Sequence, residues 1–209
     1  MNVKLKICGM RDLANNAEVA ALQPDYIGFI FYDKSPRYVG IDFKMPAIST
    51  SIKRVGVFVN ELTEIILDKV NQHELDFVQL HGDESVEQCQ ELKSNGIKII
   101  KVFSINNDFD FKAVKSYADY VSYFLFDTKG KYFGGNATTF DWDLLQKYDQ
   151  HIPFFLSGGI SIENVVAIKK IKNLNMYALD VNSGVEISPG VKDVTKIKEL
   201  KRAMSSLLL

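Results

Sequence analysis

Two side chains far apart in the sequence have the chemistry for proton transfer. Cys8 lies near the N-terminus in KICGMR (residues 6–11), and Asp127 lies in FDT (residues 126–128), more than a hundred residues later. A thiolate can accept a proton as a general base, and a carboxylic acid can deliver one. If both segments end parallel strands of one barrel, the thiol and the carboxylate converge on one pocket.

The elements that must position these groups follow from periodicity. Short β-rich runs alternate with stretches of helical spacing, which is typical of parallel strands joined by helical crossovers. Eight such units favour a compact (β/α)8 barrel over a doubly wound open sheet, whose glycine-rich first turn is missing here. The expected strands are Val3–Cys8, Tyr26–Phe31, Arg54–Val59, Phe77–His81, Ile97–Phe103, Tyr120–Phe126, Ile152–Ser157 and Tyr177–Val181. The clearest expected helices are Asp12–Leu22, Thr63–Gln72, Glu84–Ser94, Asp141–Tyr148, Ile162–Ile171 and Val194–Leu208.

Several residues mark the expected helix ends. Asp12, Asp141 and Ser161 have side chains that commonly cap the first turn of a helix, and each stands at an expected start. Gly96 follows Glu84–Ser94, where a glycine commonly ends a helix. We also expect Pro189-Gly190 to open a helix.

Composition restricts the class of protein. The 209 residues suit a single domain spanning 1–209, and with 46% hydrophobic and 24% charged residues they resemble an ordinary globular chain. A net charge of −1 argues against a nucleic-acid partner. The apolar runs are strand-sized and no signal peptide stands out, so we expect a cytoplasmic protein without a membrane partner. Two cysteines and three dispersed histidines predict neither a disulfide framework nor a metal site.

In a barrel of this kind, chemistry gathers at the C-terminal ends of the strands. The expected ends carry Cys8-Gly9, Tyr32 to Arg37, Asn60, Gln79 with His81-Gly82, Ser104, Asp127-Thr128, Ser157-Gly158-Gly159, and Asp180 with Ser183-Gly184. Because loops are polar in any protein, Asn60, Ser104 and Gln79 fit a functional role and an ordinary loop role equally well.

Glycine follows the last two expected strands. Gly158 and Gly159 close the seventh, and Ser183 and Gly184 follow the eighth. Glycines there let backbone N–H groups approach an anion, and a helix N-terminus adds a favourable dipole. This arrangement predicts a phosphate-bearing ligand, although glycines that only permit tight turns are the alternative.

An ordered set of motifs runs along the whole chain: KICGMR at 6–11, SPRYV at 35–39, GVFVN at 56–60, VQLHG at 78–82, FDT at 126–128, FDW at 140–142, LSGGI at 156–160 and DVNSGVEISPGVKD at 180–193. By these motifs the chain resembles the phosphoribosylanthranilate isomerase family from end to end. The resemblance implies a TIM barrel of the ribulose-phosphate-binding type. It also implies an Amadori rearrangement of N-(5-phosphoribosyl)anthranilate, a phosphosugar substrate, in tryptophan biosynthesis without a cofactor.

The chemistry of that rearrangement assigns roles to the residues. Asp127 is the candidate acid that protonates the ribose ring oxygen, and Cys8 is the candidate base that removes the proton from the sugar C2. A free thiol ionises near pH ~8.5 and a free carboxyl near ~4, so the surroundings must oppose both defaults. Strand alternation puts Lys6 on the face of Cys8, where its charge would favour the thiolate. A small buried hydrophobe is the alternative reading of Cys8.

Three further residues are candidates for substrate binding. By resemblance, Arg37 would hold the anthranilate carboxylate in paired hydrogen bonds. His81 either lines the pocket or satisfies a backbone carbonyl. Asp180 either orients the substrate hydroxyls or pairs with Lys6, because the first and last strands adjoin in a closed barrel; both roles are compatible.

The chain departs from the family pattern at two places. A glycine-threonine-glycine sequence is common after the sixth strand, where this chain has GGNAT (residues 134–138). The loop 129–135 is a candidate lid over the substrate, and the departure puts its conformation in doubt. Asn182 replaces a frequent serine and should be tolerated.

Two rival functions stay open, and so does the assembly state. One rival is another phosphosugar isomerase on the same barrel; the other is a phosphosugar-binding barrel that has lost turnover. The C-terminal Leu207-Leu208-Leu209 would finish the last helix against the barrel, and we expect a monomer.

Overall fold

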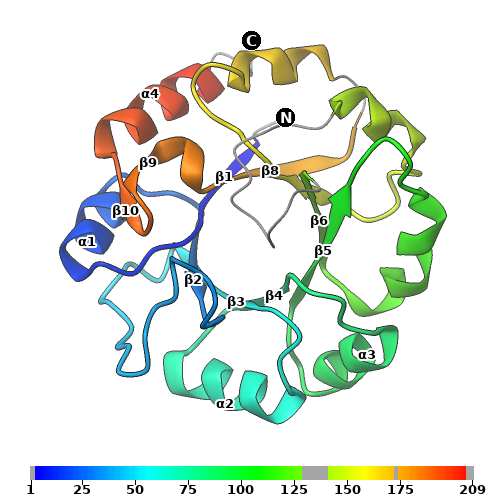
Figure 1. Cartoon of the computed structure of the whole chain (residues 1–209), viewed down its shortest axis with the longest axis horizontal. Coiled ribbons are helices and arrows are strands. Elements are labelled where there is room, and N and C mark those ends of the chain that lie inside the picture. The colour runs from blue at the N-terminus through cyan, green and yellow to red at the C-terminus, as the bar shows by residue number, and fades with distance from the viewer. Residues whose placement is uncertain (1–2, 129–140, 172–173, 206–209) are drawn as a thin grey trace.

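The eight strands close into one parallel barrel, in the order β1 to β8 along the chain. The computed structural model describes residues 3–128, 141–171 and 174–205. Helical segments form a ring around the strands (Figure 1). The strands are β1 (Lys4–Ile7), β2 (Tyr26–Ile30), β3 (Lys53–Phe58), β4 (Phe77–Leu80), β5 (Ile99–Ile105), β6 (Tyr123–Thr128), β7 (Phe154–Leu156) and β8 (Met176–Val181). The predicted (β/α)8 class is confirmed.

The outer ring mixes two kinds of helix. The α-helices are α1 (Leu13–Ala21), α2 (Thr63–His73), α3 (Val86–Ser94) and α4 (Val194–Ser205). The 3₁₀ segments are η1 (Phe111–Tyr120), η2 (Trp142–Lys147), η3 (Val165–Lys170) and η4 (Ser183–Val185). Helical spacing alone does not separate the two kinds. The expected helical segments Asp141–Tyr148 and Ile162–Ile171 are found as the 3₁₀ segments η2 and η3. The segment η1 was not predicted, and residues 31–52, all described, connect β2 to β3 without a helix.

The predicted caps are confirmed in part. Asp12 and Asp141 each accept a hydrogen bond from the first turn, from Asn15 N and Asp143 N respectively. Gly96 follows α3 with a φ of +79°, the left-handed region that glycine tolerates best. Ser161 is not a cap, because η3 begins three residues later than expected, after Asn164.

Side-chain alternation divides the core into an inner and an outer part. Tyr26 of β2 and Leu125 of β6 belong to an apolar cluster with Val55, Phe77, Ile100, Val102, Phe155 and Ala178. Their chain neighbours Ile27 and Phe126 belong to a separate cluster that includes residues of α1 and α4. One set therefore fills the barrel and the other packs under the helices.

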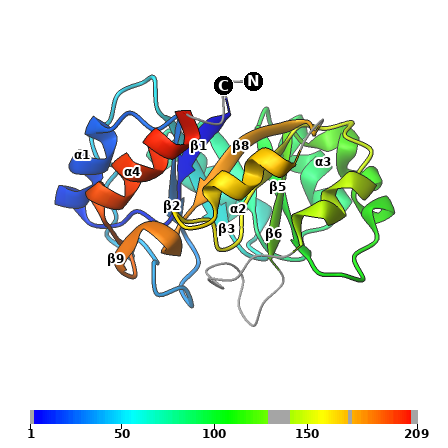
Figure 2. The same ribbon diagram turned by 90° about the horizontal axis from the view of Figure 1, so that it is seen from above.

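A small hairpin follows the last barrel strand. The strands β9 (Glu186–Ser188) and β10 (Val191–Lys192) pair antiparallel, and Gly190 in the turn has a φ of +84°. The prediction that Pro189-Gly190 opens a helix is wrong; this pair makes the hairpin turn, and α4 starts at Val194. Figure 2 shows β9 at the opposite end of the barrel from the start of β1.

No helix among the described residues is long and apolar enough to cross a bilayer. The candidate lid, residues 129–135, and the sequence GGNAT (134–138) lie outside the described residues, as does Leu207–Leu209.

Candidate active site

A polar layer lies inside the barrel, beyond the inner apolar cluster and toward the C-terminal ends of the strands. The pocket there is lined by five of the predicted site residues, Cys8, Arg37, His81, Asp127 and Asp180, and also by Tyr32, Gln79, Ser157 and Asn182. The expected convergence of a thiol and a carboxylate on one pocket is thus seen in the structure.

Cys8 lies next to a buried ion pair. Lys6 and Asp180 are partners in the register of β1 and β8, and Lys6 Nζ lies 2.8 Å from Asp180 Oδ1. A Cβ placed on Gly28 of β2 would lie 2.8 Å from Cys8 Sγ and 3.3 Å from Lys6 Nζ, so the thiol and the ammonium are neighbours. The expected pairing of Asp180 with Lys6 is confirmed.

Burial and the charge of Lys6 act in opposite directions on the pKa values of Cys8 and Asp180. Burial raises the pKa of the Cys8 thiol; Lys6 and Lys192 oppose this with positive charge, and Asp180 adds to it. Burial also raises the pKa of Asp180, against the effect of Lys6. Lys6 favours the thiolate as expected, but burial outweighs it and the thiol is held mainly protonated in the free protein.

Asp127 is buried and has two described neighbours. Its Oδ1 accepts a hydrogen bond from Thr128 N at 2.8 Å, and its Oδ2 lies 3.4 Å from His81 Nε2. The other ring nitrogen, His81 Nδ1, lies 3.0 Å from Gln79 Nε2. With the amide as donor, Nδ1 accepts and Nε2 carries the ring proton toward Asp127. His81 is also part of the pocket lining. Of its two predicted roles, lining the pocket or satisfying a backbone carbonyl, the structure shows the first.

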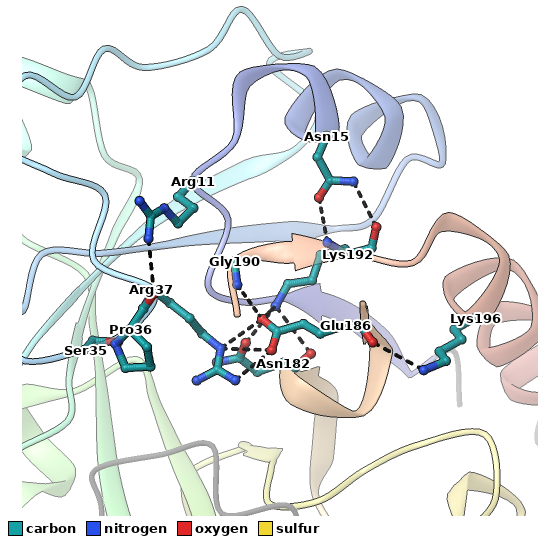
Figure 3. A network of polar contacts seen from close by, with 10 residues as sticks. All are labelled: Arg11, Asn15, Ser35, Pro36, Arg37, Asn182, Glu186, Gly190, Lys192 and Lys196. Atoms are coloured by element: carbon teal, nitrogen blue, oxygen red, sulfur yellow. Dashed lines mark hydrogen bonds and ion pairs between the residues drawn. The ribbon is translucent and has the colours of Figure 1, made fainter. Parts of the chain in front are cut away.

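Arg37 reaches the pocket from the loop after β2 and is already held by a carboxylate. Glu186 of β9 accepts from Arg37 Nε at 2.8 Å and from Nη2 at 2.6 Å. The same carboxylate lies 2.6 Å from Lys192 Nζ. Figure 3 shows both cations meeting Glu186. Burial opposes ionisation of Glu186, but Arg37 and Lys192 outweigh it and lower its pKa.

The two glycine segments lie side by side at the ends of β7 and β8. Gly158 and Gly159 have φ values of +91° and +61°. A Cβ on Gly158 would lie 2.6 Å from Thr128 N, and one on Gly184 would overlap Ile160 O. Close packing therefore requires glycine at positions 158 and 184, and Ser183 begins the short η4 turn that contains Gly184. The structure thus shows the conformational role of these glycines, and phosphate binding at them stays a prediction.

Sequence reasoning missed two residues of this region, Glu186 and Lys192. Both lie in the motif at 180–193, but nothing in their spacing shows that they face each other across a hairpin. No cluster of three or more His, Cys, Asp or Glu side chains that could hold a metal occurs in the described part of the chain.

Comparison with known proteins decides the family. The model of the family described as N-(5'-phosphoribosyl)anthranilate (PRA) isomerase matches residues 5–203. The chain belongs to this family. A relative of that name from Parabacteroides distasonis is 44% identical over 198 residues, covering 93% of this chain and 90% of the relative. Another, from Phocaeicola vulgatus, is 40% identical over 189 residues, covering 90% and 91%.

Solved structures of phosphoribosylanthranilate isomerases share the fold. The enzyme from Thermotoga maritima superposes with a TM-score of 0.84 at 34% identity, covering 98% of this chain and 99% of that one. A phosphoribosylanthranilate isomerase in complex with reduced 1-(o-carboxyphenylamino)-1-deoxyribulose 5-phosphate gives a TM-score of 0.80 at 33% identity, covering 98% and 99%. The family resemblance read from the ordered motifs is therefore confirmed.

Proposed function

We infer that this chain isomerises N-(5-phospho-β-D-ribosyl)anthranilate to 1-(2-carboxyphenylamino)-1-deoxy-D-ribulose 5-phosphate in tryptophan biosynthesis. The observation that supports this most strongly is the meeting of Cys8 and Asp127 in one pocket of a barrel whose family carries that activity. The complex of a family member with a reduced form of the product supports the same substrate class.

We propose that Asp127 is the general acid of the first step. It protonates the ribose ring oxygen while the lone pair of the anthranilate nitrogen forms the C1=N bond, and the C1–O bond breaks. His81, 3.4 Å away, faces the carboxyl through its Nε2. A donor in that position stabilises the carboxylate that remains after proton transfer.

We propose that Cys8 is the general base of the second step. As a thiolate it removes the proton from C2; the C–H electron pair forms the C1=C2 bond and the C1=N π pair moves to the nitrogen, giving an enolamine that tautomerises to the ketose. Lys6 stabilises the thiolate by charge, and Asp180 keeps Lys6 in place at 2.8 Å. Burial raises the pKa of the thiol and Lys6 opposes this rise, so the cation increases the fraction of the protein in which Cys8 is ionised and can act as the base.

Substrate binding follows from the remaining candidates. Arg37 pairs with the anthranilate carboxylate, and Asp180, with His81, faces the sugar hydroxyls. The backbone at Gly158, Gly159, Ser183 and Gly184 receives the phosphate. Two adjacent glycine segments at the ends of β7 and β8, where such barrels commonly bind phosphate, support this assignment.

We also propose that residues 1–209 form one domain that acts in the cytoplasm as a monomer. The assembly state needs its own test, because a Thermotoga maritima relative is described as dimeric. Light scattering on the purified protein after size-exclusion chromatography measures the mass directly, and a dimer mass would contradict the proposal.

The activity itself is tested with freshly made phosphoribosylanthranilate. Its fluorescence is expected to fall on addition of the protein as the ketose product forms. A protein that binds the reduced product without consuming substrate would instead be a phosphosugar-binding barrel. A protein that does neither, but turns over a different phosphosugar, would be another isomerase of this fold.

A further inference from the structure

The hairpin after β8 is tied to the first helix and to the loop after β2. Asn15 of α1 exchanges two hydrogen bonds with the main chain of Lys192, at 2.7 and 2.9 Å. Arg11 Nη1 donates to Pro36 O at 3.2 Å, next to Arg37. Figure 3 shows these contacts around one centre. The hairpin is therefore fixed to the segment that carries Arg37.

Glu186 is the centre of these contacts. In the hairpin register Lys192 pairs with Glu186, which places the two side chains together. The carboxylate accepts from Lys192 Nζ at 2.6 Å, from Gly190 N at 3.1 Å and from two nitrogens of Arg37. Its side chain is only 6% exposed, and that of Lys192 is fully buried. Both carboxylate oxygens are thus held in one orientation.

These contacts use one edge of the Arg37 guanidinium and leave another edge for a ligand. Nε and Nη2 donate to Glu186, whereas Nη1 has no hydrogen bond to any residue in the described parts of the chain. Arg37 also lines the pocket. Its backbone N donates to Ser35 Oγ at 3.1 Å, which orders the loop from the other side.

The charges in this group do not cancel. Arg37 and Lys192 are two cations around the single carboxylate of Glu186, so the group keeps one net positive charge. A guanidinium neutralised by Glu186 alone would attract an anionic ligand less. The second cation allows Glu186 to hold Arg37 without removing the charge that a carboxylate ligand needs.

We propose that Glu186 is a positioning residue: it fixes Arg37 so that the unpaired edge of the guanidinium faces the ring carboxylate of the substrate, while Lys192 keeps the group positively charged. This inference rests on the proposed function, which makes the ligand an aromatic carboxylate. An arginine ordered in advance loses less side-chain entropy when the ligand binds.

Substitution of Glu186 separates positioning from simple charge by the sign of the effect. If Glu186 acted only as a negative charge near the pocket, Glu186→Gln would attract the carboxylate more strongly and lower KM. If it positions Arg37, the same substitution frees the guanidinium and raises KM. We expect KM to rise about tenfold with little change in kcat, as for lost ground-state binding.

A double variant removes the concern that a buried lysine without a partner disturbs the fold. Glu186→Gln with Lys192→Met deletes the two opposite charges together and keeps the net charge of the group. We expect the same increase in KM. In an Arg37→Ala background, Glu186→Gln should add no further increase, since the residue through which it acts is gone.

The deciding experiment is calorimetric titration with two ligands. One ligand is the reduced product, reduced 1-(o-carboxyphenylamino)-1-deoxyribulose 5-phosphate. The other is the same compound without the ring carboxylate. Both Glu186 variants should bind the first about tenfold more weakly than the intact protein and the second equally well. Glu74→Gln is the matched control. Glu74 Oε2 lies 2.9 Å from Arg54 Nη1, and this pair does not line the pocket, so the substitution should change neither affinity.

Equal weakening of both ligands, unchanged binding, or tighter binding of the carboxylated ligand would each overturn the inference. An intact protein that consumes phosphoribosylanthranilate while its Glu186 variants bind like the intact protein defeats this inference alone. An intact protein that neither binds these ligands nor turns over the substrate defeats the proposed function and this inference with it.

Discussion

Adding one methyl group at Gly28 should displace Cys8, the proposed base, while leaving the barrel folded. A Cβ at this position would lie 2.8 Å from Cys8 Sγ and 3.2 Å from Cys8 Cα. Non-bonded heavy atoms normally approach to about 3.5 Å, so the sulfur must move by roughly 0.7 Å or the strands must separate. A displacement of about 1 Å can cost a factor of ~100 in rate when reacting groups must be aligned.

We therefore expect Gly28→Ala to lower kcat by about 100-fold and the free energy of unfolding by about 1–3 kcal/mol. The assay is the loss of substrate fluorescence, with urea unfolding measured on the same preparation. Gly56→Ala is the matched control in the neighbouring strand. Its Cβ would meet Leu75 Cδ1 at 2.5 Å and Phe58 Cε2 at 2.8 Å, in a further apolar cluster that includes residues of α2 and α3.

The control should lose stability to a similar extent and keep its kcat. A Gly28→Ala protein with the kcat of the intact protein would contradict the role of Cys8 as general base, because a base displaced in this way cannot keep the full rate. An equal loss of kcat in Gly56→Ala would also refute it, since overpacking anywhere in the barrel would explain the result.

Three further outcomes follow from the buried charges. The log of kcat/KM should rise at alkaline pH as Cys8 ionises. The double variant Lys6→Met, Asp180→Asn should move this rise to higher pH, and an unmoved profile would contradict the role of Lys6. Asp180→Asn alone should cost about 3–5 kcal/mol of unfolding free energy in urea titrations, because it leaves the Lys6 ammonium buried without its partner. Asp149→Asn, which removes the exposed pair with Lys115, should cost under ~1 kcal/mol. Equal losses in the two variants would contradict the buried pairing of Lys6. Burial lowers the pKa of Lys192 from 10.5 to about 8, so the folded state binds this proton less tightly than the unfolded state. The unfolding free energy of the intact protein, relative to that of Lys192→Met, should therefore rise between these two pH values by up to about 3 kcal/mol. The same difference in urea titrations at pH 7.5 and at pH 9.5 would contradict this prediction.

The sequence predicts the barrel well because each strand carries a local signal. Apolar runs place all eight strands to within a few residues. Alternation correctly puts the side chains of Lys6 in β1 and Cys8, just after β1, on the same side. Closure makes the first and last strands neighbours, which allowed Lys6 and Asp180 to be named as a possible pair; the register of β1 and β8 that brings them together is seen only in the structure.

Other features depend on competition that the sequence does not show. Lys6 was expected to favour the Cys8 thiolate, and it does, but the degree of burial decides the net direction of the pKa and is known only from the packed structure. Pro189-Gly190 fits a helix start and a hairpin turn equally well, so the facing of Glu186 and Lys192 could not be foreseen. The 3₁₀ segments share the apolar spacing of α-helices and differ in hydrogen bonding.

Cys8 and Asp127 are proposed to perform the two proton transfers of the isomerisation. The most direct test compares turnover of fresh phosphoribosylanthranilate by the intact protein, Cys8→Ala and Asp127→Asn, with binding of the reduced product measured for all three. We expect turnover by the intact protein alone and similar binding by all three proteins. Turnover at the intact rate in either variant would contradict the assignment of that residue.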